Sequence, residues 1–581
     1  MTISEALEIA RAKAPNEQPY EIALGCSFTP LHVQTFLAAH CKLRKPALNV
    51  KISAGTYGDL VGTIESALGN RSVQALALVL EWQDFDKRFS YREAGRWGPA
   101  FESDLAQSIS LSVQRIGSIV ERAADAFPVA IALPTLPFPP AFHTGPSQAS
   151  QTELLVRQEI AALALRLSKK PNIGVINPDW LAEETPLQGR LDLKADLLIG
   201  SPYTLTHADA VASGLARLLF PPQLLKGIIT DLDDTFWNGI VGEIGPEAVR
   251  WDSASSYHLH GLYQKTLCAL ADEGVLIAAA SKNDSAVVEK VFKRQDLLIP
   301  SSKIFPIEVH WSPKSESVRR ILSAWNISAD SVAFVDDAPL ELAEVAAAHP
   351  GITCLQFPTG DYKGILALLK KLRELFGKSR LTEDDTLRLD SIRKGAAFLQ
   401  EIEHGGSEDF LSQVQAVVTL DWEVSAKNPR ILELVNKTNQ FNLNGIRFTA
   451  SEWERTLVKS SSFLMAVKYE DKFGPLGTIA VIQGHEMERR LCIETWVMSC
   501  RAFSRRIEYQ CLRAIFERFQ VPQIEFRFAP TPKNGPLREF FEALLGTVPT
   551  PNFVISREQF DARCPALYHR LEQVIGVNAN G

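Results

Sequence analysis

GIITDLDDTFWNG, residues 227–239, is the stretch that decides the fold of this 581-residue chain. Its first four residues, Gly-Ile-Ile-Thr, form a short apolar, β-branched run of the kind expected for a buried parallel strand. The run delivers Asp231 and Asp233 to its carboxyl end, where open α/β sheets place their chemistry. We therefore expect a parallel sheet with a site at the end of this strand.

Two carboxylates one residue apart can perform different steps of phosphoryl transfer. Asp231 can attack phosphorus as a nucleophile. Asp233 can protonate the leaving oxygen and later deprotonate water. A phosphoryl group adds negative charge to an acidic site, so a divalent cation is needed, and oxygen ligands favour Mg²⁺. The alternative is that these acids belong to a solvated turn or cap a helix.

Three later segments favour the catalytic interpretation. An apolar run, 275–280, ends in Ser281-Lys282-Asn283, where a hydroxyl and backbone N–H groups at a helix start suit a phosphate. Lys314 follows in a second segment and can neutralise phosphoryl charge. A third apolar run, 331–335, ends in Asp336-Asp337, which can complete a metal site.

The order aspartate strand, serine strand, lysine and acidic strand resembles the haloacid-dehalogenase superfamily of phosphotransferases. Within it, DLDDTFWNGIVGEIG, SKND, PKSESV and FVDDAPLE are similar to the FkbH-like family. The resemblance implies a nucleophile at Asp231, an acid/base at Asp233 and phosphate contacts from Ser281 and Lys314. It also implies Mg²⁺ ligation by Asp231, the Asp233 carbonyl and Asp336, with Asp337 as an auxiliary metal-site residue.

The spacing of these segments leaves no room for a cap domain. Residues 237–251 suit a hairpin-like flap and 257–273 one helix, and nothing larger fits between Ser281 and Lys314. A site without a lid excludes water poorly by itself. This favours a substrate attached to a macromolecule, such as the arm of a carrier protein.

Composition and charge indicate which partners and which compartment to expect. A net charge of −7 gives no electrostatic footprint for nucleic acid or an anionic membrane. The eight cysteines lack metal-site spacing or a disulfide pattern, which favours a reducing compartment. No apolar run approaches membrane-spanning length, and residues 1–15 lack the apolar core of a signal peptide. We therefore expect a cytoplasmic protein. The strongly charged stretch 377–394 predicts an exposed helical connector or, as the alternative, an edge helix of the last domain.

Residues 1–222 alternate apolar strands with amphipathic helices, which predicts an α/β domain. The predicted strands include, less surely, 193–199, and the predicted helices include 97–126. Ser27, after the first strand, and His207 resemble the nucleophile and late histidine of the SGNH-hydrolase fold. The alternatives are acyl chemistry at this pair or a degenerate domain kept for docking.

Residues 395–581 are similar to the N-acetyltransferase (GNAT) domain that FkbH-like proteins carry at this end. In that fold a glycine-rich turn binds the pyrophosphate of a CoA-type ligand through backbone N–H groups. The turn should fall at 500–506, which lacks glycine but offers Arg501, Arg505 and Arg506 as bidentate anion contacts. Cys500 beside it is either a transient acyl acceptor or a buried small apolar residue.

These observations predict an α/β multidomain enzyme. Its parts are an SGNH- or flavodoxin-like domain (1–222), a capless Rossmann-like phosphotransferase domain (223–376), the connector, and a GNAT-like α+β domain. The resemblance implies loading of a glyceryl unit from 1,3-bisphosphoglycerate onto an acyl carrier protein, with Mg²⁺ and loss of phosphate. One alternative is a phosphatase of another small phosphorylated metabolite with docking domains; the other is a non-catalytic scaffold for carrier proteins.

Overall fold

The computed structural model describes residues 1–12, 17–92, 97, 99–252, 257–382, 385, 387–394, 411–457, 461–472, 474–487, 490–499 and 502–575. The chain divides into two compact units. The first comprises Met1–Gln223 with Thr449–Ser451, and the second comprises Leu224–Phe448 with Glu452–Gly581. Among the residues described, the first unit contains one sheet and the second contains two.

The first unit is built on a five-stranded parallel sheet of order β2-β1-β3-β4-β5. Its strands are β1 (Gln18–Cys26), β2 (Leu48–Ala54), β3 (Val73–Val79), β4 (Val129–Ala132) and β5 (Ile173–Val175). Apolar residues fill both faces, so helices cover both. This is the strand order of flavodoxin-like folds, in which the direction of winding reverses between β1 and β3.

The helices of the first unit form two layers. One layer consists of α1 (Ile3–Arg11), α2 (Leu31–Arg44) and α10 (Leu205–Leu219). The other consists of α3 (Leu60–Gly69), α6 (Leu105–Ala124) and α7 (Gln151–Ser168). Shorter helices connect them: α4 (Trp82–Phe85), α5 (Pro99–Glu102), α8 (Pro178–Glu184) and α9 (Leu193–Ile199).

Two predictions for this unit are wrong in detail. Residues 193–199 form helix α9, not a strand, because Asp192 caps its start by accepting a hydrogen bond from the Ala195 N–H. Gly200 ends the helix in a left-handed conformation, φ +69°. The predicted helix 97–126 is divided into α5 and α6, and Asp104 lies at the start of α6.

The second unit begins with a parallel sheet of order β10-β9-β6-β7-β8. Its strands are β6 (Gly227–Thr230), β7 (Leu276–Ser281), β8 (Ile304–Val309), β9 (Val332–Asp336) and β10 (Thr353–Gln356). Side chains alternate across it: Ile228 packs in one core layer and Ile229 in the other. The winding direction reverses between β6 and β9.

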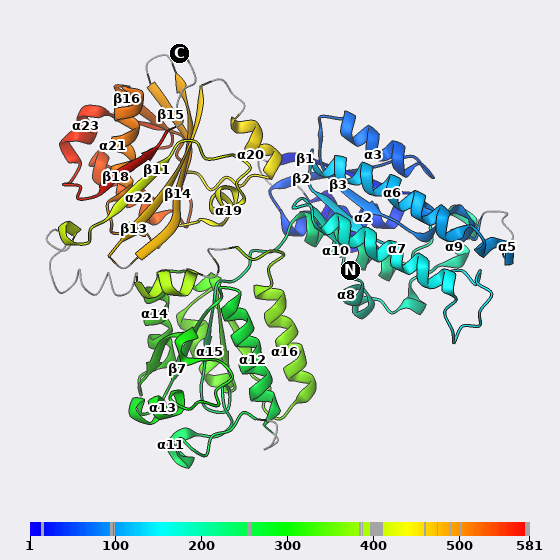
Figure 1. Ribbon diagram of the computed structural model, residues 1–581, viewed down its shortest axis with the longest axis horizontal. Coiled ribbons are helices and arrows are strands. Elements are labelled where there is room, and N and C mark those ends of the chain that lie inside the picture. The colour runs from blue at the N-terminus through cyan, green and yellow to red at the C-terminus, as the bar shows by residue number, and fades with distance from the viewer. Residues whose placement is uncertain are drawn as a thin grey trace. The chain divides into compact units, whose positions relative to one another are not determined.

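Helices cover both faces of this sheet as well (Figure 1). They are α12 (His258–Asp272), α13 (Ser285–Phe292) and α16 (Tyr362–Phe376) on one face, and α14 (Lys314–Trp325) and α15 (Pro339–Ala348) on the other. In the described ranges 231–252 and 257–314, the insertions consist of short loops and the helices α11 (Val241–Ile244), α12 and α13, without a separate cap domain. Residues 237–251 form the flap, closed by an isolated bridge between Asn238 and Arg250.

The charged connector is less exposed than its composition suggests. Lys378 and Asp385 form a buried ion pair at 2.7 Å, and Arg388 donates to the Gly274 carbonyl at 2.9 Å. Gly274 has φ +82°, and a Cβ there would meet the Asp385 carbonyl oxygen at 2.3 Å. Ile392 joins the core under β6. The connector therefore packs against the sheet because its charges pair internally and its apolar residues face inward.

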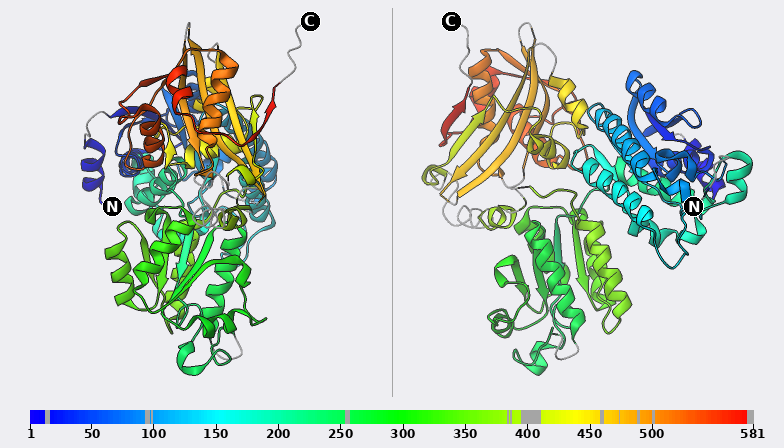
Figure 2. Two further views of the ribbon diagram at one scale, coloured as in Figure 1. Left: turned by 90° about the vertical axis from the view of Figure 1, so that its left-hand side faces the viewer. Right: turned by 45° about the vertical axis from the view of Figure 1, so that its right-hand side comes forward.

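A mainly antiparallel sheet of order β17-β16-β15-β14-β13-β11-β18 follows, with β12 paired to β15. Figure 2 shows the long strands of this sheet in yellow and orange. Its strands are β11 (Val417–Asp421), β12 (Phe441–Asn442), β13 (Ser462–Asp471), β14 (Gly474–Met487), β15 (Arg490–Met498), β16 (Gln523–Phe526), β17 (Phe553–Ser556) and β18 (Arg570–Val574). Its helices are α19 (Pro429–Lys437), α20 (Ala450–Leu457), α21 (Ile507–Phe519), α22 (Gly535–Leu545) and α23 (Arg557–Arg563). Within the described ranges of the whole chain, no helix combines the length and apolar character needed to cross a bilayer.

Candidate active site at the carboxyl ends of β6 and β9

Asp231 follows β6, and its backbone N–H donates to the Val335 carbonyl of β9 at 2.9 Å. Asp336 ends β9, and the Ala338 N–H donates to its Oδ1 at 2.9 Å. Lys314 begins α14 and reaches between the two acids. Its Nζ lies 2.9 Å from Asp231 Oδ1 and 2.6 Å from Asp336 Oδ2. The crevice where the strand order reverses therefore holds a buried carboxylate–ammonium–carboxylate cluster.

Burial dominates the electrostatics of this cluster, because all three side chains are almost inaccessible to water. Burial raises the pKa of Asp231 to about 7, although the Lys314 charge opposes this, and it also raises the pKa of Asp336. Burial disfavours the charge on Lys314, but the two carboxylates raise its pKa overall. One ammonium between two carboxylates leaves a surplus of negative charge, which a cation can balance.

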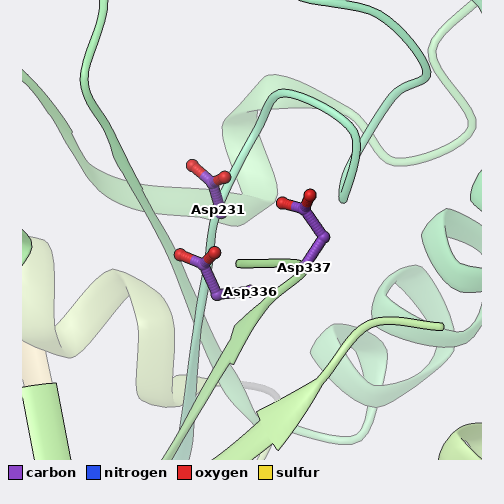
Figure 3. A group of neighbouring side chains, drawn as sticks. All are labelled: Asp231, Asp336 and Asp337. Carbon is purple, nitrogen blue, oxygen red and sulfur yellow. The ribbon is translucent and has the colours of Figure 1, made fainter. Parts of the chain in front are cut away.

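A third carboxylate completes the acidic group. Oxygen atoms of Asp231, Asp336 and Asp337 all lie within 4.8 Å of one another, and Figure 3 shows the three side chains at the ends of their strands. Thr235 holds Asp337 in place: its hydroxyl donates to Asp337 Oδ1 at 3.2 Å and accepts from the Asp337 N–H at 3.0 Å. Hard oxygen donors gathered this closely fit Mg²⁺.

Asp233 points into a separate hydrogen-bonded network. Its Oδ1 accepts from Trp237 Nε1 at 2.8 Å and from the Val241 N–H at 3.1 Å. Its Oδ2 accepts from Asn283 Nδ2 at 2.9 Å, and the same nitrogen lies 3.0 Å from Ser281 Oγ. Asp233 thus joins the flap to the turn after β7, and the structure brings it together with two residues expected to bind phosphate.

Lys282 is the expected phosphate-binding residue that points elsewhere. Its Nζ donates to Glu341 Oε1 of α15 at 2.8 Å, and its side chain is 36% exposed. Ser281 and Asn283 are buried and linked to Asp233 through the Asn283 amide, whereas Lys282 between them reaches Glu341 of α15. We therefore correct the expectation for Lys282: the structure gives it an ion pair with Glu341.

Sequence analysis missed the residues of α12 that support the strand end. His260 Nδ1 contacts the Thr235 carbonyl at 3.0 Å. The Tyr263 hydroxyl donates to Thr230 Oγ1 at 3.1 Å, and Thr230 donates to the Asp231 carbonyl at 2.8 Å. Their spacing of three residues places both on one face of the helix. Nothing in the sequence indicated which helix would pack beneath the site.

The structure does not pair Ser27 with His207. His207 is fully buried, and its ring nitrogens bind Thr135 Oγ1 at 2.8 Å and Thr185 Oγ1 at 2.9 Å. Burial lowers the pKa of His207 to about 3, with a further contribution from the Arg190 charge. Ser27 instead accepts a hydrogen bond from Gln83 Nε2 at 3.0 Å. These partners favour the alternative of a degenerate domain over acyl chemistry at a Ser27–His207 pair.

The arginines expected at the acyl site of the last domain serve internal contacts. Arg505 is 2% exposed, lies 3.5 Å from Asp471 Oδ2 and stacks over Tyr469. Arg506 Nη1 donates to the Ala566 carbonyl at 2.9 Å. Both arginines therefore make contacts within the last domain itself. Cys500 and Arg501 lie outside the described residues.

Comparison with known proteins supports the fold. No protein-family model matches the chain, and neither does any curated protein. A crystal structure of the N-terminal part of the protein BF1531 from Bacteroides fragilis, containing a phosphatase domain complexed with Mg, is similar over 66% of this chain and 100% of that one. The identity is 18% and the TM-score 0.50. The chain therefore shares the fold of that structure.

Two further solved structures show weaker likenesses. A HAD family enzyme, bt-2542 from Bacteroides thetaiotaomicron, in complex with magnesium and inorganic phosphate, has 14% identity and a TM-score of 0.19 over 24% of this chain and 98% of that one. The salicylyl-acyltransferase SsfX3 from a tetracycline biosynthetic pathway has 14% identity and a TM-score of 0.22 over 36% and 55%.

Proposed function

We propose that residues 223–376 form a Mg²⁺-dependent phosphatase of haloacid-dehalogenase type, with Asp231 as the nucleophile. The observation that carries this proposal is the buried contact of Lys314 with both Asp231 and Asp336, beside Asp337, at the point where the strand order reverses. The fold shared with a Mg-complexed structure containing a phosphatase domain supports it.

The side chains have distinct roles in this proposal. Asp231, Asp336, Asp337 and the Asp233 carbonyl would hold Mg²⁺, which when bound supplies positive charge to the phosphoryl oxygens. Lys314 adds a positive charge already fixed beside the nucleophile. Ser281, 2% exposed and tied to Asp233 through Asn283, donates to a phosphoryl oxygen.

The chemistry proceeds in two displacements. A carboxylate oxygen of Asp231 bonds to phosphorus as the bond from phosphorus to the leaving oxygen breaks, and Asp233 gives its proton to that oxygen. Asp233 then takes a proton from water, whose oxygen attacks the aspartyl phosphate. Inorganic phosphate leaves, and both carboxyl groups return to their initial protonation states.

The test of this activity is phosphate release from 4-nitrophenyl phosphate and acetyl phosphate with Mg²⁺. Asp231→Asn should lower the rate at least about a thousandfold, because the nucleophile is lost. Lys282→Ala is the matched control and should retain activity, since Lys282 pairs with Glu341. Equal rates in wild type and Asp231→Asn would remove Asp231 from its role, and an inactive wild type would favour a scaffold.

We further propose that the physiological reaction is loading of a glyceryl unit from 1,3-bisphosphoglycerate onto the phosphopantetheine thiol of an acyl carrier protein, with loss of phosphate. The similarity of DLDDTFWNGIVGEIG, SKND, PKSESV and FVDDAPLE to the FkbH-like family supports this substrate. The capless insertions in residues 231–252 and 257–314 are consistent with a substrate carried on a protein. The last domain would contact the carrier arm.

Intact-mass measurement of the carrier distinguishes the candidates. Incubation with 1,3-bisphosphoglycerate and a phosphopantetheinylated carrier should add a glyceryl unit to the thiol, and Asp231→Asn should prevent the loss of phosphate. The same carrier lacking phosphopantetheine is the control and should remain unmodified. Free phosphate without carrier modification would reduce the proposal to a phosphatase of another small metabolite.

A further inference from the structure

A cavity of 410 Å³ opens in the first unit at the carboxyl ends of β4 and β5. Its walls come from these strand ends, from α7 and α8, and from the segment between α8 and α9. Ligands of open α/β sheets bind outside the carboxyl ends of the strands, and small-molecule sites have volumes of about 300–1,000 Å³. The cavity therefore has the position and the size of a small-molecule site.

Most of the lining is apolar. Helix α7 contributes Ile160, Ala161 and Ala164, which share one face of the helix because they lie three and four residues apart. Helix α8 contributes Pro178 and Leu181. The alanine side chains are too short to fill the space between the helices, and protein interiors rarely leave a space larger than a water molecule empty. This lining suits the apolar body of a ligand.

Arg190 brings a positive charge into the apolar lining. The residue is 6% exposed, and the carbonyls of Thr185 and Thr135 hold it by accepting from Nε at 2.9 Å and from Nη1 at 2.7 Å. Its Nη2 has no hydrogen-bond partner among the described residues, and none of their carboxylates forms an ion pair with it. The end of the guanidinium is thus a fixed fork of N–H donors, which matches the two oxygens of a carboxylate.

Glu81 reaches Arg190 only through Thr135, and its own charge is already stabilised. The Glu81 carboxylate accepts from the Thr135 N–H at 3.1 Å, the Thr135 hydroxyl at 2.6 Å, the Leu136 N–H at 3.2 Å and the Tyr203 hydroxyl. Burial lowers the pKa of Arg190, and the Glu81 charge opposes this only in part. A buried cation without a direct partner is costly, and an anion in the cavity would reduce that cost.

Arg157 is the other cation of the lining, and no acidic residue among the described ones lines the cavity. Its side chain is 54% exposed, so it lies on the solvent side of the cavity. Its Nε and Nη2 donate to Glu153 Oε1 at 3.0 and 2.7 Å, which balances its charge. The positive charge inside the cavity is therefore that of Arg190.

We propose that this cavity binds a small organic monocarboxylate, with the carboxylate on Arg190 and an apolar chain or ring between α7 and α8. Inorganic phosphate fits poorly, because its remaining oxygens would face apolar walls without donors. The site belongs to the first unit and is independent of the phosphatase reaction proposed for the second.

Isothermal titration calorimetry of the full-length protein tests the class of ligand. The probes are octanoate and 4-phenylbutyrate, and their primary amides have nearly the same shape without the charge. At least one acid should bind with a Kd of about 1 mM or below, and its amide at least about tenfold more weakly. Binding of neither acid, equal binding of acid and amide, or displacement of the acid by excess inorganic phosphate would overturn the proposal.

Two variants locate the bound acid. Arg190→Met keeps an apolar stem but removes the charge, and Ala164→Phe keeps Arg190 but fills the space beside α7. Each should weaken binding of the acid at least about tenfold. Ala162→Phe is the matched control, because Ala162 is exposed on the same helix and does not line the cavity, and it should bind as wild type does.

Ala164→Phe remains decisive if Arg190→Met does not fold. Unchanged binding in Ala164→Phe, or in a folded Arg190→Met, would place the acid elsewhere and overturn the proposal. An equal loss of binding in Ala162→Phe and Ala164→Phe would also overturn it, since the cavity would then have no special part. These measurements do not depend on phosphatase activity, so they stand or fall separately from the proposed function.

Discussion

Lys314 is the residue on which the acidic crevice of the second unit depends. Lys314→Met would leave Asp231 and Asp336 buried without a counter-charge, which should lower the free energy of unfolding by about 3–5 kcal/mol. Mg²⁺ should recover more stability in this variant than in wild type, because a bound cation replaces the missing charge. Calorimetry with Mg²⁺ or with a chelator measures both effects.

Lys282→Met is the matched control for this prediction. Lys282 also forms an ion pair, but its side chain is 36% exposed, so its loss should cost less than about 1 kcal/mol. If both variants lost the same stability, or if Mg²⁺ helped them equally, the Lys314 cluster would not be the buried counter-charge described above.

The flap at 237–251 acts at the scale of an element, because it reaches the site through hydrogen bonds to Asp233. Trp237→Phe keeps an aromatic, though smaller, ring against Phe236 and Phe292 but removes the 2.8 Å hydrogen bond to Asp233. This hydrogen bond stabilises the carboxylate that Asp233 becomes when it gives its proton to the leaving oxygen, by about 1.5–3 kcal/mol, so kcat for phosphate release should fall at least about tenfold. KM should change little.

Trp251→Phe provides the comparison for the flap. Trp251 Nε1 donates at 2.9 Å to the backbone carbonyl of Asp296, and Asp296 is not one of the acidic residues of the site. This variant should lose stability comparable to that lost by Trp237→Phe yet keep its kcat. Equal losses of kcat would mean that the flap affects turnover through its folding alone.

The elements also show what sequence analysis can reach. The apolar runs before Asp231 and Asp336 predicted their strands, because a buried parallel strand must be apolar on both faces. The apolar residues of 193–199 fit the period of a strand as well as that of a helix. The hydrogen bond that Asp192 accepts from the Ala195 N–H favours the helix. The side-chain directions of Lys282 and Arg505 depend on the distant partners Glu341 and Asp471, which sequence patterns do not encode.

At the scale of the whole molecule, the first unit should have a pH dependence of its own, because His207 is buried as a neutral ring. Its pKa of about 3 lies below the ordinary value of 6.5. Between these values the unfolded chain binds more protons, so stability falls as pH decreases from 6.5 toward 3. From pH 7 to 5 the loss should be about 2 kcal/mol.

Calorimetry of the full chain checks this expectation. The transition that responds to His207→Gln identifies the first unit, and its pH dependence between 7 and 5 should decrease in that variant. His32→Gln, at a histidine of the same unit outside the threonine network, should keep the dependence of wild type. A pH dependence unchanged by His207→Gln would show that other groups set the acid sensitivity of the unit.

The short insertions around the second unit's strand ends, in the described ranges 231–252 and 257–314, have a kinetic consequence. An enzyme that closes a domain over its substrate must open it again, and that opening often limits turnover. Here product would diffuse directly into bulk solvent. In the proposed phosphatase, the same openness would admit water to the aspartyl phosphate at Asp231, so rapid hydrolysis of that intermediate would accompany access for bulky substrates.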